Sequence, residues 1–173
     1  MIINPKKYLS PTAWRYIGYA ILAIVLSIVH LVMINFIQVG GLTPDFLLIL
    51  CIWIAIREGQ FTGLFAAFLI GLFFDFISSD VIGTNALSKT VAAFIAGFFY
   101  KEGKASQIIH SFPFLIIVLA CSFVHNIVYF FFYIKSSQLN FFNFFIKYGI
   151  ALSFYTTVFA TFVVLFKIPR KRY

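Results

Sequence analysis

Few side chains in this sequence could take part in a reaction. The three histidines, His30, His110 and His125, are scattered and lack the spacing of metal ligands. Cys121 lies four residues before His125, but two ligands do not make a metal site, so we expect neither a metal nor another cofactor. The sequence has no nucleophile elbow, phosphate-binding loop or zinc-protease helix. We therefore expect no enzymatic activity and predict that His125 and Asn126 form hydrogen bonds between helices.

Two charged residues lie within apolar segments and need partners there. Asp75 is near the end of one segment and Lys89 follows a short loop, so their two helices are expected to be antiparallel neighbours. A charge in lipid is costly, which means that both side chains should face protein or water. Because the two residues lie at similar depth, we predict an ion pair between them. The alternative is that Lys89 extends to the membrane surface and that Asp75 meets water.

Small residues recur every four positions in the segment that leads to Asp75. This spacing places them on one face of a helix, where they let another helix approach closely. The next segment has a similar stripe. Two interpretations remain open: the stripes pack within this chain, or one of them accepts a helix from a partner or from a second copy. The residues are Gly63, Ala67 and Gly71 in the first segment and Ala93 and Gly97 in the second.

The composition is that of a membrane protein. Hydrophobic residues make up 62% of the 173-residue chain and charged residues 10%, whereas soluble domains carry about 25% charged residues. The net charge of +8 does not indicate nucleic-acid binding, because the basic residues lie mostly at the edges of apolar segments. No polar stretch is long enough for a soluble domain, so residues 1–173 are expected to form one integral membrane domain. Cys51 and Cys121 are expected to be buried thiols.

The apolar segments predict an all-α, polytopic membrane protein, a compact bundle of about six membrane-spanning helices. The second segment is short for a span, and Pro113 near the start of the fifth predicts a tilt or a kink. Residues 139–147 predict an amphipathic start that anchors the sixth helix in the interface, with a docking face for another protein as the alternative. The predicted spans are 17–37, 42–56, 61–77, 84–100, 108–134 and 139–168.

The distribution of basic residues predicts the orientation of the chain. Ten lysines and arginines lie on the side that holds both termini and the loops at 57–60 and 101–107, and one lies in the loops of the other side. Because positive charges are retained in the cytoplasm, both termini are expected to be cytoplasmic. Asp45 and Asp80 then lie on the outer side.

Two short motifs predict helix starts. Thr43-Pro44-Asp45 combines a side-chain cap, a proline for the first turn and an acid near the positive end of the helix. Gly83-Thr84-Asn85 combines a turn glycine with another side-chain cap. The first motif opens the second predicted span, and the second motif opens the fourth.

These motifs, in this order, resemble the family of the rod shape-determining protein MreD. That family has about six spans, a Pro-Asp pair that opens the second, a basic turn, a glycine-rich third span that ends in Gly-Leu-x-x-Asp, and a Gly-x-x-Ala-Leu start of the fourth. The resemblance covers about residues 42–100, the last two spans match only in length and hydropathy, and Lys89 is outside the family pattern. The matching residues are Pro44, Asp45, Arg57, Gly59, Gly63, Gly71, Asp75, Gly83, Ala86 and Leu87.

The resemblance implies a non-enzymatic scaffold of the cell-elongation machinery in the bacterial cytoplasmic (inner) membrane. The implied partner is MreC, a single-span protein. The implied complex also holds RodA, a class B penicillin-binding protein and MreB filaments, and it supports rod shape and sidewall peptidoglycan synthesis. A homodimer is also compatible with the small-residue stripes. The implied fold is similar to the substrate-binding subunit of energy-coupling-factor vitamin transporters.

Two other functions remain open. A vitamin-binding transporter subunit would need a small-residue stripe in its first span, but the Ala-x-x-x-Ala pattern of Ala92 and Ala96 lies in the fourth. A lipid-modifying membrane enzyme would lose its activity on substitution of Asp75 or Asp45 while the bundle still assembled.

Overall fold

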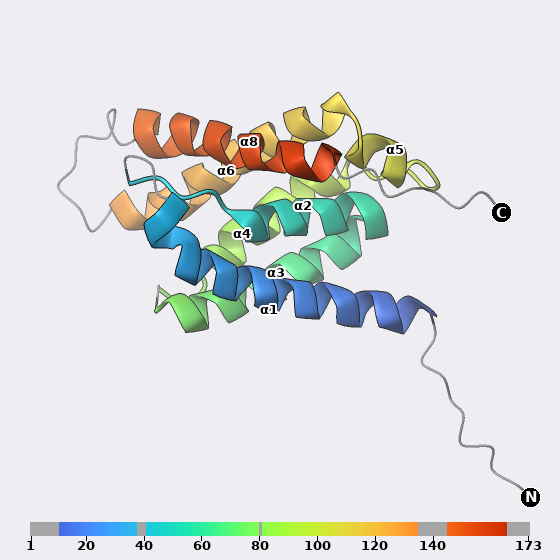
Figure 1. The fold of residues 1–173 in the computed structure, drawn as a ribbon, viewed down its shortest axis with the longest axis horizontal. Coiled ribbons are helices and arrows are strands. Elements are labelled where there is room, and N and C mark those ends of the chain that lie inside the picture. The colour runs from blue at the N-terminus through green and yellow to red at the C-terminus, as the bar shows by residue number, and fades with distance from the viewer. Residues whose placement is uncertain (1–10, 38–40, 80, 135–144, 166–173) are drawn as a thin grey trace, which may run out of the picture.

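The computed structural model describes residues 11–37, 41–79, 81–134 and 145–165, and the regular secondary structure of these ranges is helical. Figure 1 shows the helices packed side by side, most of them running along the long axis of the molecule. The elements are α1 (Pro11–Ile37), α2 (Phe46–Glu58), α3 (Gln60–Ser78), α4 (Thr84–Gly97), α5 (Ala105–Ile109), α6 (Phe112–Ile134), the π-helix η1 (Phe145–Ala151) and α8 (Leu152–Leu165).

Helix α2 lies at the centre of the bundle. It contacts α1, α3, α4, α6 and α8, so other helices surround it (Figure 1). Nine of its thirteen residues are buried, because the sequence is apolar on every face of the helix. The hydrophobic core continues from α2 into α3, α4 and α6.

Four helical segments are long and apolar enough to cross a membrane: Ala13–Val32, Gln60–Ser78, Phe112–Phe131 and Tyr148–Leu165. Helices α2 and α4 have 13 and 14 residues and are shorter than a standard span. The structure therefore confirms an all-helical bundle with several candidate spans, and the number six stays a prediction.

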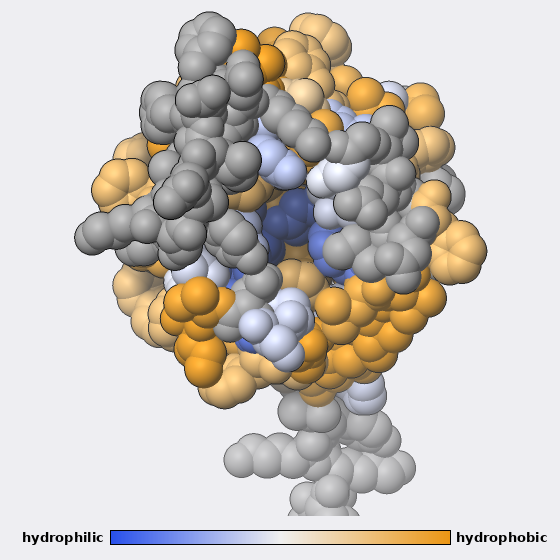
Figure 2. Space-filling model, turned by 90° about the vertical axis from the view of Figure 1, so that its left-hand side faces the viewer, coloured by the Kyte–Doolittle hydropathy of each residue, from blue (hydrophilic) through white to orange (hydrophobic). Residues whose placement is uncertain are grey.

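The outer surface of the bundle is apolar. Large hydrophobic side chains project from α1 and α3, among them Ile21, Ile28, Phe61, Phe65 and Phe76. Figure 2 shows the end of the bundle at which α6 ends: apolar residues lie around the outer perimeter, and hydrophilic residues are visible near the centre. An apolar perimeter around a polar interior is the arrangement expected of helices that face lipid.

The predicted fifth span is divided into two helices. Helix α5 ends at Ile109 and α6 begins at Phe112, where the sequence predicted one tilted or kinked helix. Pro113 lies in the first turn of α6, where its missing N–H leaves no helical hydrogen bond unmade, so it starts a helix instead of bending one. Helix α4 ends at Gly97, short of the predicted end at residue 100. The predicted amphipathic start of the sixth span lies largely outside the described residues, which resume at Phe145.

Helix α2 begins with a cap made by Asp45, whereas the sequence predicted a cap by Thr43. Asp45 Oδ1 accepts a hydrogen bond of 2.8 Å from the N–H of Leu48, and the Asp45 backbone is extended, as an N-cap requires. Pro44 lies one residue before the cap and outside the helix. The predicted motif therefore marks the helix start correctly but assigns the cap two residues too early.

The small-residue stripes pack within this chain. A β-carbon added at any of three glycines would lie only 2.5–2.6 Å from atoms of a neighbouring helix, closer than real contacts allow. Ala67 and Ala93 are fully buried as well. Of the two interpretations of the stripes, packing within the chain is the one that the structure shows, so these faces are not open to a partner. The contacts are Gly63 with Ala55, Gly71 with Ala86, and Gly97 with Gln60.

Candidate functional site

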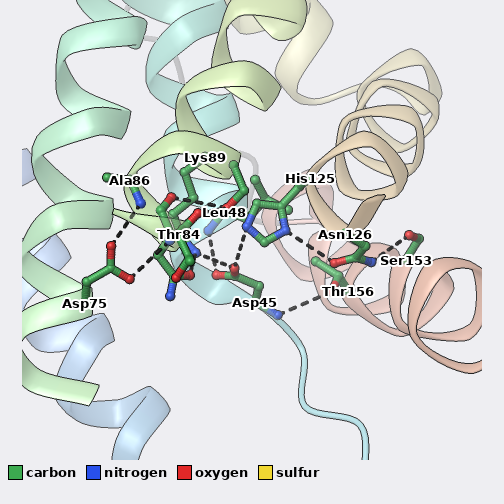
Figure 3. A network of polar contacts seen from close by, with 12 residues as sticks. Asp45, Leu48, Asp75, Thr84, Ala86, Lys89, His125, Asn126, Ser153 and Thr156 are labelled. Atoms are coloured by element: carbon green, nitrogen blue, oxygen red, sulfur yellow. Dashed lines mark hydrogen bonds and ion pairs between the residues drawn. The ribbon is translucent and has the colours of Figure 1, made fainter. Parts of the chain in front are cut away.

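The charged residues inside the bundle belong to a polar network that joins α2, α3, α4, α6 and α8 (Figure 3). Lys89 of α4 lies at its centre. Its Nζ donates to Asp45 Oδ2 at 2.7 Å and to Asn85 Oδ1, one turn earlier in α4, also at 2.7 Å. The Lys89 side chain is 1% exposed, so this ion pair is buried between α4 and the start of α2.

The predicted ion pair between Asp75 and Lys89 is wrong, and so is the alternative in which Lys89 reaches the surface. The buried Asp75 carboxylate accepts hydrogen bonds from the backbone N–H groups of Gly83, Asn85 and Ala86 at 2.8, 3.1 and 3.2 Å. These groups belong to the N-cap residue and the first turn of α4, where N–H groups lack helical partners and the helix dipole favours a negative charge. Asp75 thus caps α4, and Lys89 is left to pair with α2.

The cap of α4 differs from the predicted one. Gly83 is a turn glycine, as predicted, with φ of +99°. The predicted side-chain cap from Thr84 or Asn85 is absent, because the carboxylate of Asp75 takes that place. Thr84 instead donates its hydroxyl to the carbonyl of Val81 at 2.7 Å.

Asp75→Ala is expected to destabilise the chain by about 2 kcal/mol, because it leaves the N–H groups at the start of α4 without an acceptor. Asp75→Asn keeps an acceptor oxygen and should cost less. Thermal unfolding in mild detergent measures both losses. The double variant Asp75→Ala/Lys89→Ala should lose more stability than Asp75→Ala alone. A rescue of stability by Lys89→Ala would contradict the contacts seen here.

A second branch of the network runs from Asp45 through α6 to α8. His125 Nε2 lies 3.7 Å from Asp45 Oδ2, and His125 Nδ1 lies 3.3 Å from Asn126 Oδ1. Asn126 Nδ2 donates to Ser153 Oγ at 2.9 Å, and Ser153 Oγ donates to the Gly149 carbonyl at 2.6 Å. The Ser153 hydroxyl hydrogen is used in the bond to the Gly149 carbonyl, so the Ser153 oxygen accepts the hydrogen bond from the Asn126 N–H. The amide oxygen of Asn126 then faces His125 Nδ1. Nδ1 of the imidazole therefore carries a hydrogen.

A second polar cluster lies at the other end of α2. Glu58 accepts a hydrogen bond of 2.5 Å from the hydroxyl of Tyr19 and lies 3.3 Å from Arg15 and 3.7 Å from Arg57. Gly59 follows with φ of +97° and makes the tight turn between α2 and α3. The cluster therefore ties the first turns of α1 to the end of α2.

Two residues of the motif remain to be placed. Ala86 is buried in the contact between α3 and α4, and Leu87 is 46% exposed on the outer face of α4.

Sequence reasoning missed several members of these clusters. Asp45 was expected on the outer side, and nothing in its spacing links it to Lys89, which is 44 residues away. Ser153 and Thr156 of α8 were not predicted, although Thr156 Oγ1 accepts from the Asp45 N–H at 3.3 Å. Two hydroxyl residues three positions apart in an apolar span were the signal available for them. Glu58 lies in a predicted turn, and its role as partner of two arginines has no sequence signature.

The polar groups of these two clusters hold helices in position relative to one another. Lys89 of α4 pairs with Asp45 at the start of α2, and Asp75 of α3 accepts from backbone N–H groups at the start of α4, so both contacts join two helices. Within the described ranges, no group of three or more His, Cys, Asp or Glu residues is placed to hold a metal ion. A helical bundle with an apolar perimeter and an interior tied by such contacts is a multi-pass membrane protein.

The family of the rod shape-determining protein MreD matches residues 14–168 of the 173-residue chain. The chain belongs to this family, which confirms the resemblance and assigns it a role in the determination of rod shape. Neither the curated proteins nor the solved structures that were compared with the chain gave a match. The similarity to transporter subunits therefore stays a prediction.

Proposed function

We propose that this chain is a non-enzymatic scaffold of the bacterial cell-elongation machinery that binds the single-span protein MreC within the cytoplasmic membrane. Through that contact it would take part in a complex with RodA, a class B penicillin-binding protein and MreB filaments, and support sidewall peptidoglycan synthesis. The observation that carries this proposal is the family match over residues 14–168. The excess of basic residues on the side of the termini supports cytoplasmic ends.

Two structural features support a scaffold. The buried polar side chains join helices of the chain itself, so they stabilise a fixed shape. The outward faces of α1 and α3 are apolar, which suits contact with other membrane helices or lipid. Because Gly63 and Gly71 are covered by this chain, a partner helix would have to pack on such an outward face.

Affinity purification in mild detergent tests this proposal. The tagged chain is produced together with an MreC-type partner, and the matched control is the same partner with its single span replaced by an unrelated apolar helix of equal length. We expect recovery of the natural partner and loss of recovery with the control. Equal recovery of both would place the contact outside the membrane. If the tagged chain restores rod shape to cells that lack this protein but recovers no MreC-type partner, the scaffold proposal is contradicted.

A further inference from the structure

We propose that Arg15 and Arg57 form a binding site for the phosphate of an anionic phospholipid headgroup. The site lies at the end of the bundle where α1 begins and α2 ends, the right-hand end in Figure 1. This inference goes beyond the scaffold function. Only the choice of leaflet, the cytoplasmic one, rests on the predicted orientation.

One buried carboxylate fixes both arginines. Arg15 Nη2 lies 3.3 Å from Glu58 Oε2, and Arg57 Nε lies 3.7 Å from Glu58 Oε1. The Glu58 side chain is 7% exposed, whereas that of Arg15 is 46% and that of Arg57 is 39% exposed. Two guanidinium charges thus face one carboxylate, and the cluster keeps one uncompensated positive charge on its open side.

Aromatic rings hold the Arg57 guanidinium in place. Its central carbon lies 4.8 Å from the centroid of the Trp53 ring, and Trp53 packs edge-on against Tyr19 at 5.4 Å between centroids. Tyr19 in turn donates its hydroxyl to Glu58. Each guanidinium has five N–H donors, more than the single carboxylate of Glu58 takes up, and its planar fork matches the geometry of a phosphate. Fixing the arginines in advance lowers the entropy cost of binding.

The surroundings indicate a lipid as the source of the phosphate. Trp14 and Tyr16 are exposed in the first turns of α1, and exposed Trp and Tyr residues mark the headgroup level of a membrane. Beyond them α1 presents an apolar face along which acyl chains would lie. The loop after α4 also reaches this end, because the Tyr100 ring lies beside Gly59. It exposes Glu102 between Lys101 and Lys104, so its own net charge is small. The uncompensated positive charge of the two arginines favours an anionic over a zwitterionic lipid.

Thermal unfolding of the purified full chain in mild detergent tests the site. Phosphatidylglycerol is compared with phosphatidylcholine at equal concentration, and inorganic phosphate is a third additive. We expect phosphatidylglycerol to raise the melting temperature by several degrees more than phosphatidylcholine. Arg57→Gln and Arg15→Gln should each remove most of that difference. Lys104→Gln, which removes the same charge from an exposed position outside the Glu58 cluster, should keep it.

The other outcomes overturn the proposal. Equal stabilisation by the two lipids would remove the headgroup preference, and a loss in Lys104→Gln as large as in Arg57→Gln would reduce the effect to general surface charge. If inorganic phosphate raises the melting temperature as much as phosphatidylglycerol does, the ligand is a soluble phosphate and the lipid assignment is wrong. If the arginine variants do not fold, native mass spectrometry of the unmodified chain decides, since equal retention of both lipids contradicts the site.

Discussion

Replacing Lys89 with methionine is expected to destabilise the chain by about 3 kcal/mol, because Asp45 would keep its charge and lose its partner inside the bundle. This value is at the lower end for a broken buried ion pair, since 17% of the Asp45 side chain is exposed. The hydrogen bond from Lys89 to Asn85 Oδ1 would be lost at the same time. The buried thiols of Cys51 and Cys121 report unfolding when they react with a fluorogenic maleimide.

A double-mutant cycle isolates the ion pair. Asp45→Asn keeps an oxygen for the N–H of Leu48 but removes the charge, so it should recover part of the loss caused by Lys89→Met. The same cycle between Lys89→Met and Asp75→Asn is the matched control, because Lys89 has no contact with Asp75. We expect a coupling energy of about 1 kcal/mol or more in the first cycle and a smaller one in the second. Additive losses in the first cycle would show that the pair contributes nothing.

Gly71→Leu is expected to have an effect of similar size, about 3 kcal/mol or more, because the added side chain collides with backbone that cannot move aside. Even a β-carbon at this position would lie 2.6 Å from Ala86 Cα and from the Asn85 carbonyl oxygen. Helices α3 and α4 would have to separate, and Asp75, one turn later in α3, would be pulled from the N–H groups that it caps. The melting temperature in mild detergent measures the loss.

Two alanine substitutions give this prediction a matched control. Gly71→Ala adds only the colliding β-carbon, whereas Gly18→Ala in α1 adds the same atom where nothing lies within 4 Å. Gly18→Ala should be neutral or slightly stabilising, because alanine favours a helix by about 1 kcal/mol over glycine. Equal stability of the two variants would refute the close packing of α3 on α4. Because this contact is internal, loss of a partner in Gly71→Leu would report misfolding and not the position of a docking face.

The local features of this fold were predictable from residue type and spacing. The glycine at position 83 adopts the predicted turn, and the stripe from Gly63 to Gly71 marks a close helix contact. The proline at position 113 was misread as a bend, because its effect depends on whether a helix has already begun before it. Sequence spacing describes one helix or one hairpin at a time, and within that range it was informative.

By itself, the sequence determined that this is a helical membrane protein of the MreD family, because apolar segment length and short ordered motifs are properties of neighbouring residues. Only the tertiary structure decided which polar groups meet. Helix α2 lies at the centre and brings Asp45 to Lys89. Three backbone N–H groups at the start of α4 bind the Asp75 carboxylate. The physical reason is that a buried charge binds the nearest complementary group in space, and helix packing sets that distance.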